Sequence, residues 1–209
     1  MDGVWYFDFV SPFAYLALGE IEEISREVPI ALKPVLLGAL LTHYGQLGPA
    51  EVEPKRLQTY RMCVWKARER GIEFRFPPAH PFNPLTLLRV AAALDGEPQA
   101  VRIVFDLIWK EGRDPSAPQS LSLLRERLGV DDFDALIERA GAKERLRRNT
   151  EAAIAAGVFG VPTLALGNQL FWGLDALPMA RVFLINPSLF DEEEMRRLDH
   201  LPVAAARPR

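Results

Sequence analysis

The stretch "FDFVSPFAYLA" at residues 7–17 decides how the fold begins. Its first half belongs to the run "VWYFDFV" at residues 4–10, which is aromatic and β-branched apart from Asp8. Such a nearly continuous apolar run is typical of a strand that is buried on both faces, as in a parallel sheet. Ser11 then offers an N-cap and Pro12 a first helical residue, so a helix is predicted to follow the strand directly.

The helix is expected to reach about Glu27, and "IALKPVLL" from Ile30 predicts a second strand. From about residue 36 to residue 157 the apolar side chains recur at helical spacing instead. The predicted helices are "KRLQTYRMCVWKARERG", "LTLLRVAAAL", "QAVRIVFDLIWKEG", "DDFDALIERA", with Asp131 or Asp132 as its cap, and "AKERLRRNTEAAIAAG".

The strand pattern returns in "VPTLALGNQLFWG" at residues 161–173, where the Gly167-Asn168 pair predicts the turn of a β-hairpin. A final helix is expected from Leu174, with Asp175 as its N-cap. The order is β-α-β, a helical block, then β-β-α. This order predicts an α/β fold in which residues 1–35 and 158–209 form a small four-stranded sheet domain. Residues 36–157 would form an all-helical domain inserted into it.

The composition is that of a soluble globular chain of 209 residues, with 49% hydrophobic and 25% charged residues and a net charge of −3. No basic segment predicts binding to nucleic acid, and no apolar run is long enough to span a membrane. Cys63 is the only cysteine, and no signal peptide precedes the first strand, so a cytoplasmic location is expected. The scattered residues His43, His80 and His200 have no partners at ligand spacing, so no metal site is predicted.

The two halves, with "VPT" opening the third strand, resemble the thioredoxin fold, and the helical insertion resembles its DsbA-like branch. The stretch at residues 7–17 and the combination "GVFGVPT" and "LFWGLDAL" look like 2-hydroxychromene-2-carboxylate isomerases and kappa-class glutathione transferases. The resemblance covers nearly the whole chain in element order. It implies glutathione as the cofactor, a small aromatic substrate and a homodimer.

Ser11 and Ala14 stand where redox members of this fold carry the two cysteines of a Cys-x-x-Cys pair. Without these thiols, dithiol-disulfide exchange is excluded. The resemblance implies instead that Ser11 is the catalytic residue, whose hydroxyl donates a hydrogen bond to the glutathione thiolate at the helix N-terminus. The alternative is that Ser11 only caps the helix.

The resemblance also implies which other residues bind glutathione. A cis bond between Val161 and Pro162 would turn the Val161 backbone toward the peptide, and Asp175 would receive its α-amino group. An ordinary trans-proline and a plain N-cap are the alternatives for these residues. The full implied set is Ser11, Phe13, Val161, Pro162, Leu174 and Asp175.

The second-substrate pocket departs from the family pattern. Family isomerases use a lysine and an asparagine after the second strand to bind the substrate carboxylate, but residues 36–49 contain no lysine. Asn83 and Arg89 are candidate substitutes, with Phe13, Phe82 and Trp65 as an aromatic wall, and packing or loop structure is the alternative role for each of them. Two other functions therefore remain: a kappa-like glutathione transferase, or a DsbA-fold binding protein that needs no glutathione.

Overall fold

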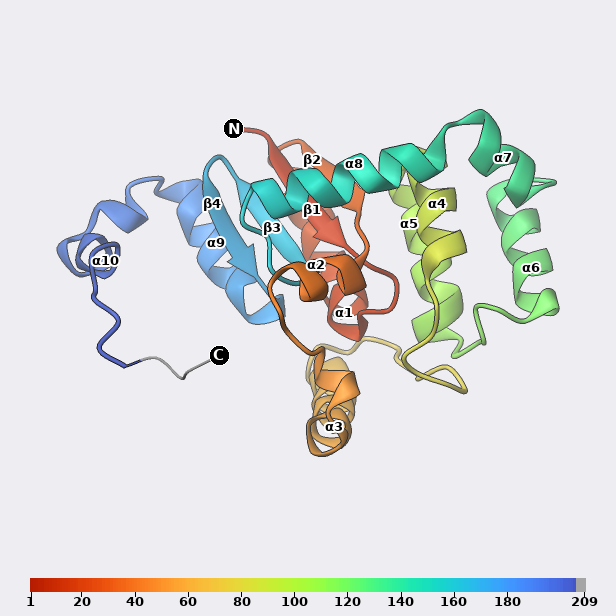
Figure 1. Cartoon of the computed structure of the whole chain (residues 1–209), viewed down its shortest axis with the longest axis horizontal. Coiled ribbons are helices and arrows are strands. Elements are labelled where there is room, and N and C mark those ends of the chain that lie inside the picture. The colour runs from red at the N-terminus through yellow and green to blue at the C-terminus, as the bar shows by residue number, and fades with distance from the viewer. Residues whose placement is uncertain (206–209) are drawn as a thin grey trace.

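The computed structural model describes residues 1–205 and confirms the α/β fold, with a four-stranded mixed sheet at its centre (Figure 1). β1 (Gly3–Phe7) pairs in parallel with β2 (Ile30–Pro34) and antiparallel with β3 (Thr163–Leu166). β4 (Gln169–Trp172) pairs antiparallel with β3 and completes the order β2-β1-β3-β4. The first and last parts of the chain therefore meet along β1, as the β-α-β and β-β-α pattern predicted.

The chain between β2 and β3 is helical. It forms α2 (Leu37–His43), η1 (Pro49–Glu51), α3 (Glu53–Glu69), α4 (Leu85–Ala93), α5 (Pro98–Phe105), the π-helical turn η2 (Asp106–Lys110), α6 (Pro118–Leu128), α7 (Phe133–Arg139) and α8 (Ala142–Ala155). All the predicted helices are present, and Asp132 caps α7. Helices α2 and α6 were not predicted, although Pro118 in the first turn and Gly129 in a left-handed C-cap mark the ends of α6.

Several boundaries differ from the prediction. β1 ends at Phe7 rather than Val10, because the Asp8 side chain accepts the Val10 N–H and turns the chain away from the sheet. α1 (Pro12–Ile24) ends before Glu27, and the Ser25 hydroxyl donates to the Ile21 carbonyl at its last turn. After β4 come η3 (Leu174–Ala176), α9 (Leu177–Ile185), η4 (Leu189–Asp191) and α10 (Glu193–Leu198).

The two faces of β1 contribute to two buried clusters, because side chains alternate along a strand. Trp5 and Phe7 join the larger cluster, which includes residues of α1 and α9. Tyr6 points the other way and packs in a cluster with Leu40 of α2 and Ala153 of α8. Helices therefore cover both faces of the sheet. The N-terminus of α1 lies close to the end of β1.

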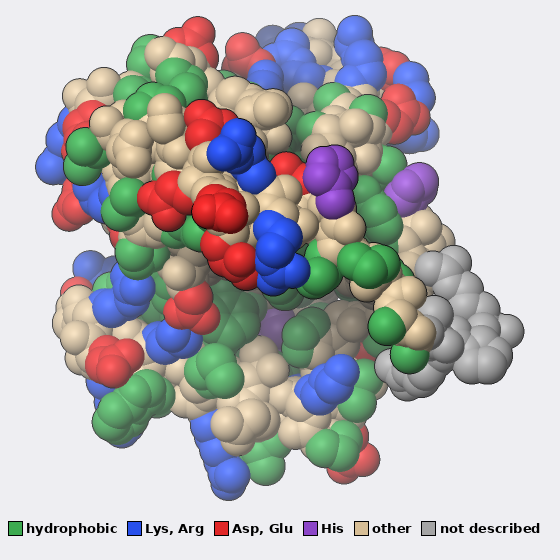
Figure 2. Space-filling view, turned by 90° about the vertical axis from the view of Figure 1, so that its left-hand side faces the viewer, with side chains coloured by type: hydrophobic (Ala, Val, Ile, Leu, Met, Phe, Trp, Pro, Cys, Tyr) green, Lys and Arg blue, Asp and Glu red, His purple; other side chains and the backbone are tan. Residues whose placement is uncertain are grey.

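The sheet and the helical block share the larger cluster. Trp5 and Phe7 stack with ring centroids 4.9 Å apart, and Phe105 at the end of α5 lies 5.7 Å from Phe7. Within residues 1–205, no helix is long and apolar enough to cross a membrane. Figure 2 shows a cleft between the lowest part of the molecule, where Figure 1 places α3, and the remainder.

Candidate functional site

Ser11 lies at the junction of β1 and α1, in the extended conformation of an N-cap. Its Oγ accepts the Ala14 N–H at 3.3 Å, which confirms the predicted cap. The same hydroxyl donates to the Val161 carbonyl at 3.5 Å, and the Val161–Pro162 bond is cis, as predicted. Folding therefore brings Ser11 beside the segment that precedes β3, although the two are far apart in the sequence.

One backbone hydrogen bond connects the segment around Pro162 to the residues just before Asp175. Val161 precedes the first β1–β3 pair, Tyr6 with Thr163, so it lies outside the sheet ladder. The Pro162 carbonyl accepts the Gly173 N–H at 2.8 Å, directly before η3. Hydrogen bonds thus connect Ser11 to Val161, and Pro162 to the start of η3, and these residues lie largely buried next to one another.

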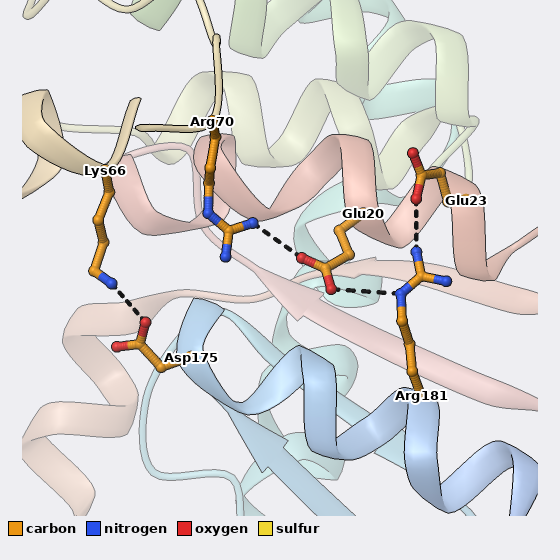
Figure 3. Close-up of polar contacts among 6 residues, drawn as sticks. All are labelled: Glu20, Glu23, Lys66, Arg70, Asp175 and Arg181. Carbon is orange, nitrogen blue, oxygen red and sulfur yellow. Dashed lines mark hydrogen bonds and ion pairs between the residues drawn. The ribbon is translucent and has the colours of Figure 1, made fainter. Parts of the chain in front are cut away.

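Asp175 does not cap α9. The N-cap of α9 is Ala176, without a side-chain hydrogen bond, and Asp175 lies in the preceding 3-10 turn. Its carboxylate is directed away from the helix and pairs with Lys66 of α3, with Nζ 2.6 Å from Oδ1 (Figure 3). The predicted cap is therefore wrong, because the 3-10 turn separates Asp175 from the first turn of α9.

Besides the Lys66–Asp175 pair, Figure 3 shows ion pairs that connect α1 to α3 and to α9. Arg70, one turn after Lys66 on α3, pairs with Glu20 of α1 at 3.1 Å. Arg181 of α9 contacts Glu20 at 3.5 Å and Glu23 at 2.7 Å. The face of α1 that follows Ser11 is thereby connected to both α3 and α9.

Two other predicted glutathione-binding residues differ in accessibility. Leu174 is almost fully buried, side chain and backbone together. Phe13 is half-buried and packs against the larger cluster from the first turn of α1. Phe13 lies in α1, which Ser11 caps, and Leu174 lies in η3 next to Asp175.

The loop in front of Ser11 is anchored by side chains that sequence reasoning missed. The Trp109 Nε1–H donates to the Phe9 carbonyl at 2.9 Å. The His80 Nε2 lies 2.8 Å from the Val10 carbonyl, so it carries the proton that this carbonyl accepts. Both anchors come from the helical block, so the inserted helices fix the position of the catalytic candidate.

His80 is engaged through both ring nitrogens. Its Nδ1 lies 2.7 Å from the Tyr60 hydroxyl, and the same hydroxyl donates to the His80 carbonyl at 2.8 Å. Burial lowers the pKa of His80, and the hydrogen bond to the Val10 carbonyl opposes this change. His80 therefore connects α3 to Val10. Both of its ring nitrogens are engaged within the protein, so neither is free to contact a substrate.

Asp8 is a fully buried carboxyl three residues before Ser11. Its Oδ1 accepts the Val10 N–H at 3.0 Å and its Oδ2 accepts the Leu37 N–H at 2.9 Å. Burial raises the pKa of Asp8 to about 7, and the two backbone hydrogen bonds oppose this rise. Asp8 therefore joins the Ser11 loop to the start of α2.

Two of the residues predicted to line a second-substrate pocket, Trp65 and Arg89, line different cavities. Trp65 lines a hollow of about 340 Å³ on α3 with Tyr60 and Arg61. Arg89 lines a different cavity of about 840 Å³ between α4, α7 and α8, where its Nε is buried without a partner. The periodicity of single helices gave no information on which helices face each other.

Phe82 and Asn83 have structural contacts of their own. Phe82 packs near His80 and Trp109, with ring centroids 6.1 and 6.2 Å away. The Asn83 Oδ1 accepts the Leu85 N–H at 3.0 Å and so closes the first turn of α4. These contacts explain both residues without a substrate.

Cys63 is fully buried in α3, and burial raises the pKa of its thiol to about 12. In residues 1–205 no group of three His, Cys, Asp or Glu side chains is arranged to bind a metal ion. The site therefore offers a buried hydroxyl at a helix N-terminus, a backbone segment outside the sheet ladder and an exposed carboxylate. These groups can bind a short peptide with an anionic centre and a cationic end.

Comparisons with known proteins give a consistent result. The sequence model of the DsbA-like thioredoxin domain family matches residues 4–184. A 2-hydroxychromene-2-carboxylate isomerase from Pseudomonas putida is 30% identical over 182 residues, which cover 84% of this chain and 90% of the relative. A kappa 2 glutathione S-transferase from Caenorhabditis elegans is 25% identical, over 88% of this chain and 91% of that protein. The solved structure of a 2-hydroxychromene-2-carboxylate isomerase superposes with a TM-score of 0.77 and 27% identity, covering 97% of this chain and 100% of its own.

Proposed function

Since this chain belongs to the 2-hydroxychromene-2-carboxylate isomerase family within the DsbA-like thioredoxin domains, we propose that it is a glutathione-dependent isomerase. Its reaction would interconvert 2-hydroxychromene-2-carboxylate and trans-o-hydroxybenzylidenepyruvate. The observation that carries this proposal is the contact of Ser11 with Val161 at the start of α1. A hydroxyl stands there in place of a reactive thiol, so the thiol must come from a bound molecule.

The residues present fit glutathione. The Ser11 hydroxyl can exchange its 3.5 Å hydrogen bond to the Val161 carbonyl for one to a thiolate, and the α1 N-terminus favours negative charge at the same place. Val161 lies outside the sheet ladder, so its backbone can pair with the cysteinyl residue of a peptide. The Asp175 carboxylate is 76% exposed and carries the charge that an α-ammonium group requires. The cysteinyl and γ-glutamyl parts of the tripeptide thus have complementary groups.

Bound glutathione would supply a nucleophilic thiol, whose reversible addition to a conjugated double bond permits rotation about that bond. Ser11 lowers the pKa of the thiol by donating a hydrogen bond to its charged form. A depression of one pKa unit corresponds to about 1.4 kcal/mol, which one hydrogen bond and a helix N-terminus can supply. The anchored Phe9 and Val10 carbonyls keep Ser11 at this position.

A kappa-like glutathione transferase is the second candidate. The observation that favours it is the absence of a lysine from residues 36–49, where family isomerases bind the substrate carboxylate. Such an enzyme shares the activated thiol but releases the conjugate. The residues around Ser11 are the same for both functions, and the second-substrate side distinguishes them.

Titration calorimetry with glutathione, followed by an absorbance assay with the chromene substrate, tests the proposal. We expect glutathione to bind and the isomerisation to depend on its concentration. Glutathione binding without isomerisation, but with conjugation of an electrophilic aromatic compound, would favour the transferase. A chain that binds no glutathione would exclude both functions and leave the binding protein.

We further propose that the protein forms a homodimer and works in the cytoplasm. Relatives of this fold generally pair, and the apolar side chains of Val182 and Ile185 on α9 are exposed in the single chain. A lone buried cysteine fits a reducing compartment. Light scattering should give about 47 kDa, twice the chain mass of 23.5 kDa, and a value near the chain mass would contradict the dimer.

A further inference from the structure

The carboxylate proposed to receive the glutathione ammonium group already has a cationic partner within the chain. Lys66 Nζ lies 2.6 Å from Asp175 Oδ1 and links α3 to η3 (Figure 3). The Asp175 side chain is 76% exposed, whereas that of Lys66 is only 20% exposed. A ligand ammonium group that binds the Asp175 carboxylate must therefore displace Lys66 or share the carboxylate with it.

The Lys66–Asp175 ion pair can break while Lys66 stays close to Asp175. An ion pair with one partner so exposed is weak, because water and salt compete for both charges. Lys66 nevertheless remains beside Asp175, since most of its side chain is covered. Arg70, one turn further along α3, forms a separate ion pair with Glu20 of α1 and does not contact Asp175 in the pairs that the described residues form.

We propose that Lys66 and Asp175 together recognise the zwitterionic α-amino-acid end of glutathione. Asp175 would bind the α-ammonium group and Lys66 the α-carboxylate group. This inference rests on the proposed function, because it names a further binding residue of the same site. Lys66 thereby determines specificity for a γ-glutamyl ligand.

The chemistry of the two partners is complementary. The α-ammonium and α-carboxylate groups are attached to one carbon, so the ligand presents opposite charges side by side. The Lys66–Asp175 pair presents the matching charges side by side. When the ligand enters, each protein charge exchanges one partner for another and stays paired. A ligand that lacks either charge leaves one protein charge without its partner, and this mismatch provides the discrimination.

Titration calorimetry with three peptides tests the inference. The peptides are glutathione, γ-aminobutyryl-cysteinyl-glycine, which lacks the α-carboxylate, and glutaryl-cysteinyl-glycine, which lacks the α-ammonium group. Lys66→Met should weaken glutathione binding about fivefold, the upper range for an exposed ion pair. The same variant should bind the peptide without the α-carboxylate as tightly as the wild type or more tightly. Asp175→Asn should weaken glutathione binding but leave the binding of the peptide without the α-ammonium group unchanged.

The matched control is Arg70→Met, which breaks another ion pair of α3 and leaves Lys66 in place. It should change glutathione binding less than twofold, within the lower range for exposed pairs. If Lys66→Met binds glutathione as tightly as the wild type or more tightly, Lys66 is only a competitor and the inference is overturned. Equal losses for all three peptides, or an equal loss in the Arg70→Met variant, would also overturn it. If the wild type binds no glutathione, the proposed function fails together with the inference.

Discussion

Replacing Asp8 with asparagine should remove a pH dependence from the stability of the fold. Asp8 is fully buried, and burial raises its pKa from the ordinary 3.8 to about 7. Because the folded pKa lies above the unfolded one, the folded chain binds more protons between about pH 4 and pH 7. The stability that the protonated carboxyl provides is complete below the unfolded pKa and is lost as the pH rises through the folded pKa.

The size of the effect follows from the shift. A shift of about 3 units from 3.8 to about 7 corresponds to about 4 kcal/mol in the free energy of unfolding. Asparagine has nearly the same shape, does not titrate and retains one oxygen for the Val10 or Leu37 N–H. The lost second acceptor leaves one buried N–H unpaired, which costs about 1–3 kcal/mol, but this cost is the same at every pH.

Urea unfolding of both chains between pH 4 and pH 8 measures the difference directly. We expect the stability of the Asp8→Asn variant, relative to the wild type, to increase by up to about 4 kcal/mol across this range. Every other titrating group cancels in the comparison. A difference that stays constant with pH would refute the reasoning, because it would mean that Asp8 does not titrate in this window.

Two further variants test the site and its scaffold. Ser11→Ala should lower the free energy of unfolding by about 1 kcal/mol through the lost cap. If Ser11 donates to the thiolate, the same change should raise the pKa of bound glutathione by about one to two units, measured by thiolate absorbance against pH. An unchanged titration with full activity would make Ser11 a simple cap. Gly96→Ala should destabilise the chain by about 2 kcal/mol or more, because Gly96 has a φ of +70° and an added Cβ would lie 1.9 Å from the Leu32 carbonyl oxygen. Gly129→Ala is its control: with a similar φ but no atom near the added Cβ, it should cost only about 1 kcal/mol by thermal unfolding, and equal losses would contradict the argument.

The sequence by itself determined the elements whose signals are local. Ser11 and Pro12 mark the start of α1, and the Gly167-Asn168 pair marks the β-hairpin, because capping and turn chemistry depend on neighbouring residues. The order of strands and helices then limits the topology to few arrangements. The cis Val161–Pro162 bond and its place beside Ser11 were also predicted, but through resemblance to known proteins.

Only the tertiary structure decided what surrounds Ser11. The Phe9 and Val10 carbonyls are bound by Trp109 and His80, which come from distant parts of the helical block. Asp8 interrupts a strand in the sequence, and nothing there indicates that Leu37 binds its second oxygen. These contacts depend on which helices pack together, and helical periodicity identifies the buried face of a helix without identifying its partner.

The second-substrate residues and Asp175 show the same limit. Trp65 and Arg89 each lie on a correctly predicted helix, yet they line different cavities, because α3 and α4 turn these side chains to separate neighbours. Asp175 had the residue type and position of a helix cap, but a 3-10 turn moved the start of α9 beyond it and left its carboxylate to Lys66. Local propensity fixes where elements form, whereas the charges and cavities between elements arise only from the packing of distant segments.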